Sequence, residues 1–285
     1  MGSKVWLDNQ LLDEADAKIS VFDHGLLYGD GVFEGIRVYS GKVFEFQAHL
    51  DRLYRSARAL RLPIDQDKET MMANVETTAQ ANNIKDGYIR LIATRGVGDL
   101  GLDPTICKKA QIIIIAATIQ LYPKEFYEKG LKVISSSVVR NHPLSLSPQI
   151  KSLNYLNNIM AKLEAVDRGM PEAIMYNHMG YIAEATGDNV FIIREGVIYT
   201  PPSEAGALEG ITRSVVIRLA REHGYEVIER NLVRFDLYAA EEIFLTGTAA
   251  EVIGIVEVDH HKIGCGSPGP ITRDLLKKFN EYVRQ

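Results

Sequence analysis

The chain has 285 residues, of which 46% are hydrophobic and 24% are charged, and its formal net charge at pH 7 is −5. This length allows two domains with sizeable cores, and the slightly acidic balance argues against nucleic acid or an anionic membrane as a partner. The two cysteines lack metal-ligand spacing, the N-terminus lacks the apolar core of a signal peptide, and no apolar run reaches membrane-spanning length. We therefore expect a cytoplasmic protein without a metal site.

The first 120 residues predict strands interleaved with helices. Turn residues mark two hairpins, one at Asn9 and one at Ser40-Gly41. Apolar residues at helical spacing alternate with runs of β-branched residues. Strands are expected over residues 4–12, 31–46, 87–95 and 111–121, and helices over 47–62 and 68–83.

The segment 121–127 breaks the strand pattern and is predicted to connect two domains. Beyond it, strands are expected over residues 130–139, 172–177, 180–185, 189–202 and 241–258, and helices over 156–168, 212–223 and from 272. The fold class is therefore a mixed α/β (α+β) architecture, with a small N-terminal α/β domain over 1–120 and a larger C-terminal domain over 128–285.

The glycine motif Gly96-Val97-Gly98-Asp99-Leu100-Gly101 follows a predicted strand and matches the pattern of dinucleotide-binding folds. That fingerprint must open a helix whose N-terminus receives the pyrophosphate. Here Leu102-Asp103-Pro104 follows, and the next apolar run is strand-like. A nicotinamide- or flavin-dependent oxidoreductase is therefore disfavoured, and a flexible glycine loop is the better interpretation.

Lys151 is the only permanently charged residue between Asn141 and Ala161. Desolvation of a lysine disfavours the ammonium form and lowers its pKa, which is how proteins prepare lysines for Schiff-base chemistry. A surface lysine is the more common explanation for one such residue. The catalytic interpretation therefore depends on finding the other groups that an imine-forming lysine needs.

Two segments have residues suited to an anion. Leu208-Glu209-Gly210-Ile211-Thr212-Arg213 precedes an amphipathic helix, whose first-turn N–H groups bind phosphate readily. The same Ile-Thr-Arg sequence recurs at 271–273, where Pro270 and Asp274 indicate ordinary capping. The second segment, Thr246-Gly247-Thr248-Ala249-Ala250, places hydroxyl and N–H groups after a hydrophobic strand, which fits either an anion site or a tight turn.

Two charged side chains complete the candidates. Glu184 ends a predicted strand, and a buried carboxylate there needs a cationic partner such as a protonated pyridine nitrogen. Arg52 lies on a predicted helix with several other arginines, and one of these turned inward could clamp a phosphate with its planar fork.

Six motifs then occur in an order that resembles the class IV, fold-type IV aminotransferases, most closely the branched-chain amino acid aminotransferases. These are YGDGVFEGIRVY (28–39), HLDRL (49–53), IKSLNYLNN (150–158), EATGDNVF (184–191), LEGITR (208–213) and LTGTAAEV (245–252). The resemblance spans essentially the whole chain. It implies a barrel-like C-terminal domain that binds pyridoxal 5'-phosphate.

The resemblance also implies a role for each matched residue. Lys151 would form the aldimine with the cofactor and move the substrate Cα proton, and Glu184 would pair with the pyridine nitrogen. The implied ligands of the phosphate are Arg52, the N–H groups of Ile211 and Thr212 beside Gly210, and Thr248. Leu208 would pack against the ring, and Tyr155 would hydrogen-bond near the phenolic oxygen.

The implied reaction is ping-pong transamination of L-leucine, L-isoleucine and L-valine with 2-oxoglutarate. The resemblance places Tyr28, Phe33, Gly35 and Tyr88 around an apolar side-chain pocket. Ala249, with Thr248, would receive the α-carboxylate, and Arg90 the second carboxylate of glutamate. Leu100 would reach a neighbouring subunit, because family members are at least dimers.

Two alternatives share this fold. D-amino acid aminotransferases carry an Arg-x-His pair after the Arg-Gly of the glycine loop, whereas Arg95-Gly96 here is followed by Val-Gly-Asp-Leu-Gly. Aminodeoxychorismate lyase shares the cofactor site, but FEGIR and GTAAE favour the aminotransferase. The sequence therefore predicts a homo-oligomeric enzyme acting on amino acids and 2-oxo acids.

Overall fold

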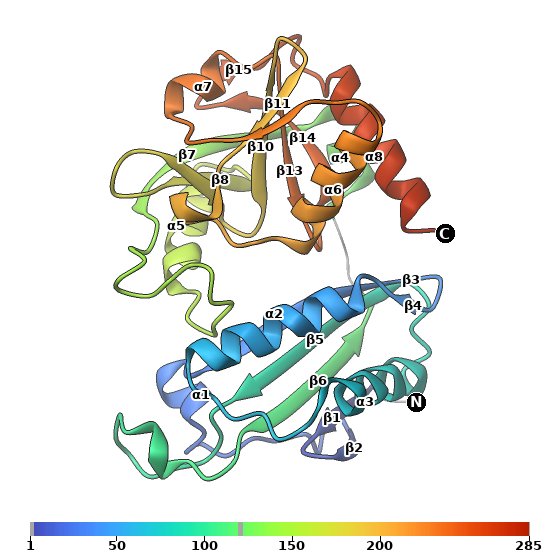
Figure 1. Cartoon of the computed structure of the whole chain (residues 1–285), viewed down its shortest axis with the longest axis vertical. Coiled ribbons are helices and arrows are strands. Elements are labelled where there is room, and N and C mark those ends of the chain that lie inside the picture. Colours follow the sequence, from blue (N-terminus) through green and yellow to red (C-terminus); the bar gives the residue numbers. More distant parts are fainter. Residues whose placement is uncertain (1–2, 119–121, 285) are drawn as a thin grey trace. The chain divides into compact units, whose positions relative to one another are not determined.

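The structure is a computed structural model, and it describes residues 3–118 and 122–284. The chain divides into two compact units, which are traced by sequence colour in Figure 1. The first unit is Met1–Ile119 with Ile150–Asn154, and the second is Gln120–Gln149 with Tyr155–Gln285.

The first unit is built on a six-stranded antiparallel sheet in the order β2-β1-β6-β5-β3-β4. Its strands are β1 (Lys4–Leu7), β2 (Gln10–Asp13), β3 (Gly31–Tyr39), β4 (Lys42–Val43), β5 (Gly87–Thr94) and β6 (Gln111–Ala117). Its helices are α1 (His24–Tyr28), α2 (Phe46–Ala59) and α3 (Lys68–Ala81), and Pro104–Ile106 form a 3-10 turn. Between β5 and β6, a stretch that the structure describes throughout, no α-helix follows the glycine motif, as the sequence predicted.

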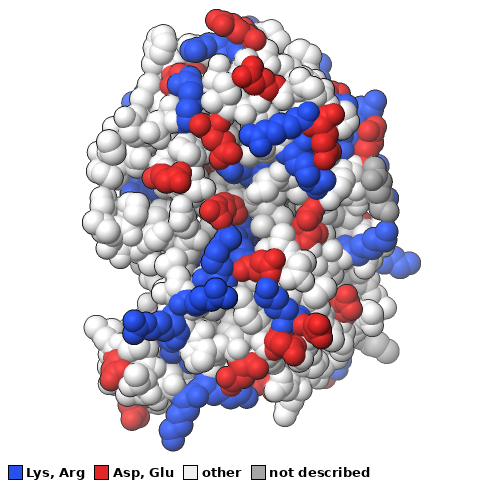
Figure 2. Space-filling view, in the orientation of Figure 1, with Lys and Arg blue, Asp and Glu red and all other residues white. Residues whose placement is uncertain are grey.

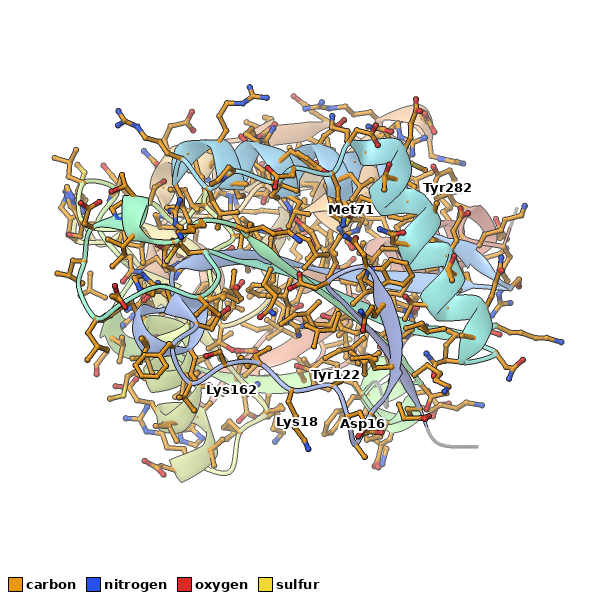
Figure 3. All side chains as sticks on the ribbon, turned by 90° about the horizontal axis from the view of Figure 1, so that it is seen from below. Asp16, Lys18, Met71, Tyr122, Lys162 and Tyr282 are labelled. Atoms are coloured by element: carbon orange, nitrogen blue, oxygen red, sulfur yellow. The ribbon has the colours of Figure 1, made fainter. Side chains whose placement is uncertain are left out.

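Helices α2 and α3 cover one face of this sheet (Figures 1 and 3). Leu50 of α2 and Met71 of α3 are fully buried against Val32 and Ile36 of β3. Side chains alternate between the two faces of a strand, so these core residues leave Phe33 and Gly35 on the opposite face. The packing of the helices thus decides which β3 side chains remain available for a site.

The segment Ile150–Asn154 belongs to the first unit, although the predicted boundaries assign it to the second domain. The physical reason is backbone pairing with β3. The N–H of Phe33 donates to the carbonyl of Lys151 over 3.0 Å, and the N–H of Leu153 donates to that of Gly31 over 2.9 Å. A single β-bridge between Val32 and Ser152 lies between these bonds.

The second unit is built on a nine-stranded mixed sheet in the order β12-β11-β10-β13-β14-β7-β8-β9, with β15 paired to β14. Strand β9 also packs near β10, so the sheet curls into the half-barrel expected from the sequence. The strands are β7 (Leu131–Val139), β8 (Glu172–Tyr176), β9 (Ile182–Ala185), β10 (Asn189–Arg194), β11 (Val197–Thr200), β12 (Val227–Glu229), β13 (Glu242–Gly247), β14 (Glu251–Val258) and β15 (His261–Lys262).

The helices of the second unit are α4 (Lys124–Lys129), α5 (Leu156–Asp167), α6 (Ile211–Glu222), α7 (Arg234–Tyr238) and α8 (Pro270–Tyr282), and Ser203–Ala205 form a 3-10 turn. Both faces of the central strands are buried. Ile243 and Leu245 of β13 enter one core, while Phe244 stacks on Phe191 of β10 at 4.7 Å on the other face. Helices α6 and α8 pack on β13 and against each other (Figure 1). The mixed α/β fold class is thus confirmed.

The three shortest helices were not predicted. Helix α4 begins inside the predicted connection 121–127, of which residue 121 lies outside the described ones. Helix α1 is defined by local polar groups: the Asp23 carboxylate accepts from the Gly25 N–H over 2.7 Å, and Gly29 ends the helix in the left-handed conformation. Five or six residues are too few for a 3.6-residue period to be recognised in a sequence.

The surface carries charges of both signs. Figure 2 shows lysine and arginine side chains interspersed with aspartate and glutamate on the displayed face. Within residues 3–118 and 122–284, the helices are all too short or too polar to cross a membrane.

Candidate active site

Lys151 is held by its backbone at the edge of β3. Its N–H donates to the Ser56 hydroxyl of α2 over 3.2 Å, and its carbonyl accepts from Phe33. Its ammonium nitrogen lies 4.7 Å from the centre of the Phe33 ring. The side chain is half-buried, so the amine rests over an aromatic face.

Four of the predicted substrate residues lie together on this same face of the sheet. Gly35 of β3 pairs with Arg90 of β5, and the Arg90 guanidinium lies 4.5 Å from the Phe33 ring centre and 5.4 Å from that of Tyr88. A Cβ on Gly35 would lie 1.9 Å from the Tyr88 hydroxyl, so glycine is what makes room for that hydroxyl. The structure thus places both the Lys151 amine and the Arg90 guanidinium against the Phe33 ring.

The opposite face of β3 carries a buried polar network that sequence reasoning missed. Arg52 of α2 donates to both carboxylate oxygens of Glu34, from Nε over 2.8 Å and from Nη2 over 2.7 Å. His49 Nδ1 lies 2.7 Å from Glu34 Oε2. One edge of the Arg52 fork is therefore committed to Glu34. The available signal was Glu34 between apolar residues of the strand, together with a histidine and an arginine three residues apart on the next helix.

The network perturbs the pKa values of its members. Burial raises the pKa of Glu34, but Arg52 and His49 outweigh it and lower that pKa to about 2. Burial also lowers the pKa of His49; Glu34 opposes this effect, and the positive charges of Arg52 and Lys151 add to it. These directions favour an ionised Glu34 and a neutral His49 at neutral pH.

Tyr28 contacts the glycine loop that carries Leu100, also within the first unit. The Tyr28 hydroxyl at the end of α1 accepts from the Gly101 N–H over 3.1 Å, and His24 Nε2 lies 3.0 Å from the Asp99 carbonyl. These contacts fix the glycine loop against α1. Leu100 is 71% exposed, so the loop presents an apolar side chain to solvent.

Glu184 lies in the second unit, where it is only 5% exposed. Its Oε1 accepts from Arg140 Nη2 over 2.8 Å, and its Oε2 accepts from the Leu208 N–H over 2.9 Å and from Asn189 Nδ2 over 3.2 Å. A carboxylate has about four acceptor positions, so Glu184 can still accept from one more donor. Arg140 was missed because it lies outside the six motifs. Asn189 lies inside the motif 184–191, but the resemblance gave no role to it.

Helix α6 begins beside this carboxylate. Its cap residue is Gly210, which has no side chain to satisfy the N–H groups of the first turn. A Cβ on Gly210 would lie 2.0 Å from Asn189 Oδ1, so the backbone approaches Asn189 closely. Asn189 also donates to the Leu208 carbonyl over 2.9 Å. Glu184, Leu208 and the start of α6 therefore share Asn189 as a neighbour.

Helix α8 shows what the repeated Ile-Thr-Arg sequence does with an anion. The Glu242 carboxylate accepts from the N–H groups of Ile271 and Thr272 over 3.1 and 2.8 Å. The Thr272 hydroxyl donates to the same carboxylate over 2.7 Å. Helix α6 has the same residues at its start, behind a glycine cap.

The remaining predicted cofactor residues occupy element boundaries of the second unit. Thr248 and Ala249 are half-buried in the turn between β13 and β14. Tyr155 is half-buried at the cap position of α5. All three residues thus lie in turns or at element ends, where binding residues are common in proteins.

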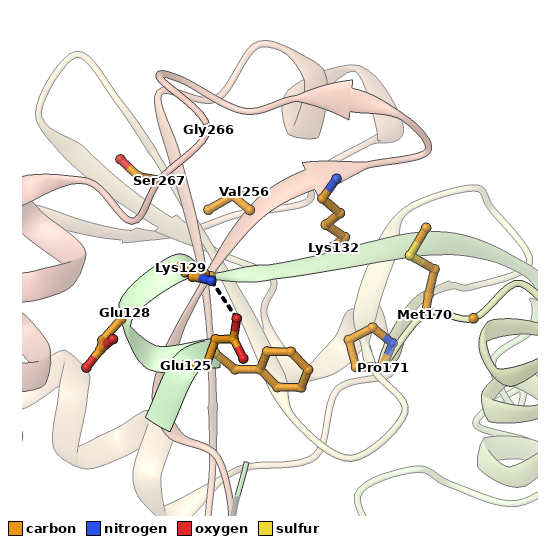
Figure 4. Close-up of a pocket in the computed structure, with 12 residues that line it drawn as sticks. Glu125, Glu128, Lys129, Lys132, Met170, Pro171, Val256, Gly266 and Ser267 are labelled. Atoms are coloured by element: carbon orange, nitrogen blue, oxygen red, sulfur yellow. Dashed lines mark hydrogen bonds and ion pairs between the residues drawn. The ribbon is translucent and has the colours of Figure 1, made fainter. Parts of the chain in front are cut away.

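A separate pocket of about 660 Å³ in the second unit is lined by none of the predicted site residues (Figure 4). Its two lysines are paired, Lys129 with Glu125 over 2.5 Å and Lys132 with Glu257 over 2.9 Å. Phe126 and Met170 line it as well. We do not assign the site to this pocket, because both of its lysines already have carboxylate partners. Among the described residues, no cluster of three or more His, Cys, Asp or Glu could hold a metal ion.

Comparisons with known proteins agree with the motif pattern. The family model for amino-transferase class IV matches residues 31–258. A protein of Methanocaldococcus jannaschii, provisionally named a branched-chain-amino-acid aminotransferase, is 50% identical over 98% of this chain and 96% of its own length.

Solved structures show the same similarity. The branched-chain amino acid aminotransferase of Escherichia coli is 35% identical with a TM-score of 0.96, covering 99% of this chain and 94% of that one. The enzyme from Thermoproteus uzoniensis, solved with norvaline, is 39% identical with a TM-score of 0.93, covering 100% of this chain and 95% of that one. The resemblance inferred from six motifs is confirmed, and the chain belongs to the class IV aminotransferase family.

Proposed function

We propose that this chain is a pyridoxal-phosphate-dependent aminotransferase of L-leucine, L-isoleucine and L-valine, with 2-oxoglutarate as acceptor in ping-pong turnover. The observation that carries the proposal is Glu184. Three donors hold its buried carboxylate in place, and one acceptor position remains. A protonated pyridine nitrogen is a donor of the right charge for that position.

The residues present fit this cofactor. Lys151 offers an amine over the Phe33 ring, and the α6 start offers N–H groups behind a glycine cap. When bound, pyridoxal phosphate supplies an electron-withdrawing ring that stabilises negative charge at the substrate Cα. In our proposal Lys151 is the residue whose amine would hold the cofactor and would move the proton at the substrate Cα.

The phosphate is proposed to bind the N–H groups of Ile211 and Thr212, with Gly210 allowing close approach. The α8 start supports this assignment, since the same residues there bind a carboxylate. Thr248 and Arg52 complete the proposed phosphate ligands.

Two further contacts are proposed for the cofactor ring. Leu208 packs against the ring face, and its N–H holds Glu184 Oε2. Tyr155 hydrogen-bonds near the phenolic oxygen from its position at the start of α5.

The substrate assignment rests on the face that carries Lys151. Phe33, Tyr88 and Gly35, with Tyr28, are proposed to bind the apolar side chain, and one methylene in such a pocket changes binding by only about 1–3 kcal/mol. Several branched side chains are therefore accepted. Arg90 is proposed to bind the second carboxylate of glutamate, and the Thr248–Ala249 turn is proposed to bind the α-carboxylate. The norvaline in the Thermoproteus uzoniensis structure is likewise an amino acid with an apolar side chain.

The chain is proposed to act as a homodimer or higher oligomer in the cytoplasm. Exposed apolar side chains gather on α1 and the glycine loop: Leu26, Leu27, Val97, Leu100 and Leu102. A surface of this kind is typical of an interface, and we propose that Leu100 reaches the site of a second copy. Leu100→Asp should reduce the molar mass in solution, and an unchanged mass would contradict this interface.

The test of the function is glutamate formation. Purified protein with pyridoxal phosphate and 2-oxoglutarate should form glutamate from L-leucine, L-valine and L-isoleucine. Glutamate formed only from D-alanine would instead indicate the D-amino acid activity, and pyruvate released from aminodeoxychorismate would indicate the lyase. Protein that binds NAD and forms no glutamate would overturn the proposal.

A further inference from the structure

Thr246 is a buried threonine whose hydroxyl is not satisfied. The residue is 1% exposed, and its Oγ1 has no hydrogen-bond partner among the described residues. A buried hydroxyl without a partner destabilises a protein, so such groups are rare and call for an explanation. The other buried threonine at a strand end of this sheet, Thr200, is satisfied, since it donates to the Val190 carbonyl over 2.8 Å.

The strand pattern places the Thr246 side chain. Residues of β13 alternate between faces, so Thr246 lies on the Phe244 face, away from Ile243 and Leu245. Its partner across the ladder is Asn189 of β10. Directly paired residues carry their side chains on the same face, with Cβ atoms about 5 Å apart.

Asn189 connects this position to the start of α6. A Cβ on Gly210 would meet Asn189 Oδ1, so Gly210 touches that side chain. Helix α6 also packs on β13. Thr246 therefore shares its face of the sheet with Asn189, the residue that touches the start of α6.

The start of α8 provides the chemical precedent within the same chain. There a threonine hydroxyl and two N–H groups converge on the Glu242 carboxylate. At α6 the N–H groups of Ile211 and Thr212 also belong to the first turn behind a glycine cap, one position earlier than in α8, where Pro270 precedes Ile271. Thr246 adds a hydroxyl from strand β13. An anion at this point would accept from all of them.

We propose that the Thr246 hydroxyl donates a hydrogen bond to the cofactor phosphate at the start of α6, as a binding residue beyond those to which the resemblance gave a role. The proposal rests on the proposed function, because the phosphate belongs to that cofactor. It also accounts for a buried hydroxyl that the protein alone leaves unsatisfied.

The test compares Thr246→Val with the wild-type protein. Valine keeps the shape and removes the hydroxyl. A hydrogen bond to a charged group contributes enough that pyridoxal phosphate should bind roughly 10- to 100-fold more weakly. Pyridoxal, which lacks the phosphate, should bind both proteins equally. If the ratio of pyridoxal phosphate affinity to pyridoxal affinity were the same in Thr246→Val as in the wild type, the proposal would be overturned.

Unfolding without cofactor gives a second readout. Thr246→Val should leave the unfolding midpoint of the cofactor-free protein unchanged or raised, because it removes an unsatisfied hydroxyl. The matched control Thr200→Val should lower that midpoint and leave the affinity ratio unchanged. If the valine variant does not fold, Thr246→Ser and Thr246→Ala form a second pair, in which only serine should retain tight phosphate binding.

Inorganic phosphate separates this proposal from the proposed function. Wild-type protein that rejects pyridoxal phosphate but binds inorganic phosphate more tightly than Thr246→Val would overturn the function and support the Thr246 contact. Inorganic phosphate and pyridoxal phosphate binding both unchanged by Thr246→Val would overturn the contact alone. A wild-type protein that binds neither inorganic phosphate nor pyridoxal phosphate would overturn both the proposed function and the Thr246 contact.

Discussion

Glu34 and Arg52 form a bidentate ion pair inside the first unit, with Arg52 Nε 2.8 Å from Oε1 and Nη2 2.7 Å from Oε2. Glu34 is completely buried and Arg52 is 3% exposed. The pair joins β3 to α2 directly behind the face that carries Phe33. It therefore links the stability of the first unit to the orientation of a proposed phosphate ligand.

Glu34→Gln should destabilise the protein strongly, because it leaves the buried Arg52 charge without its partner. Breaking a buried pair in this way costs about 3–5 kcal/mol. The free energy of unfolding in urea, without cofactor, measures the loss. The control Asp51→Asn removes an exposed partner of Lys68 and should cost less than about 1 kcal/mol. Equal effects of the two substitutions would contradict the role given to Glu34.

The same network predicts an acid-sensitive protein. The pKa of Glu34 is lowered from 4.5 to about 2, so its contribution is present above pH 4.5 and is lost as the pH falls toward 2. The pKa of His49 is lowered from 6.5, so below that pH the unfolded state binds its proton more readily and stability falls further. The full Glu34 shift corresponds to about 3 kcal/mol.

Urea unfolding of the cofactor-free protein as a function of pH measures this dependence. Stability should decrease as the pH falls from 6.5 toward 2. In Glu34→Gln the part of the decrease below pH 4.5 should be smaller, since glutamine does not titrate. If the free energy of unfolding of the wild-type protein stayed constant through this pH range, the Glu34, Arg52 and His49 network would not control the stability at acid pH.

Glu184→Gln should reduce kcat while Lys151 still reacts with the cofactor. Loss of one electrostatic contact to the reacting system costs roughly 10²–10³ in rate. Leucine-dependent glutamate formation measures the rate, and the absorbance of the bound cofactor reports the lysine. Glu204→Gln, on the 3-10 turn Ser203–Ala205 of the same unit, is the control and should keep full activity. A Glu184→Gln enzyme with a normal kcat would contradict the role proposed for the Glu184 carboxylate.

Gly210→Ala should weaken cofactor binding, because the new methyl would meet Asn189 Oδ1 at 2.0 Å. Forcing such a group into a packed site costs about 1–3 kcal/mol. Gly187→Ala is the matched control, since its Cβ would have no atom within 4 Å. Equilibrium binding of pyridoxal phosphate distinguishes them: only Gly210→Ala should show a higher Kd. Equal Kd values would contradict close approach at the α6 start.

The longer elements could be predicted from the sequence because each repeats its own period. The 3.6-residue spacing of Leu50, Leu53 and Ala57 marked α2, and all three are buried in the core. The short helices could not be predicted, since they depend on caps such as Asp23. The place of Ile150–Asn154 depends on backbone pairing with β3, which carries no side-chain signal.

The candidate site was predictable to the extent that its residues lie in motifs. Lys151, Phe33, Gly35, Tyr88 and Arg90 come from segments that the motif pattern or its neighbours identified, and the structure brings them to one face. The partners of the charged residues were not predictable. Arg140 lies 44 residues from Glu184, and only the folded sheet brings the two side chains together.

The most direct test of the central claim is to identify the lysine that binds the cofactor. Protein loaded with pyridoxal phosphate should absorb near the boundary of the visible and ultraviolet, and borohydride should bleach this band. Peptide mass spectrometry should then find the reduced pyridoxyl group on Lys151, and Lys151→Ala should lose both the band and the activity. A pyridoxyl group on another lysine, or an unlabelled protein that still forms glutamate, would contradict the account.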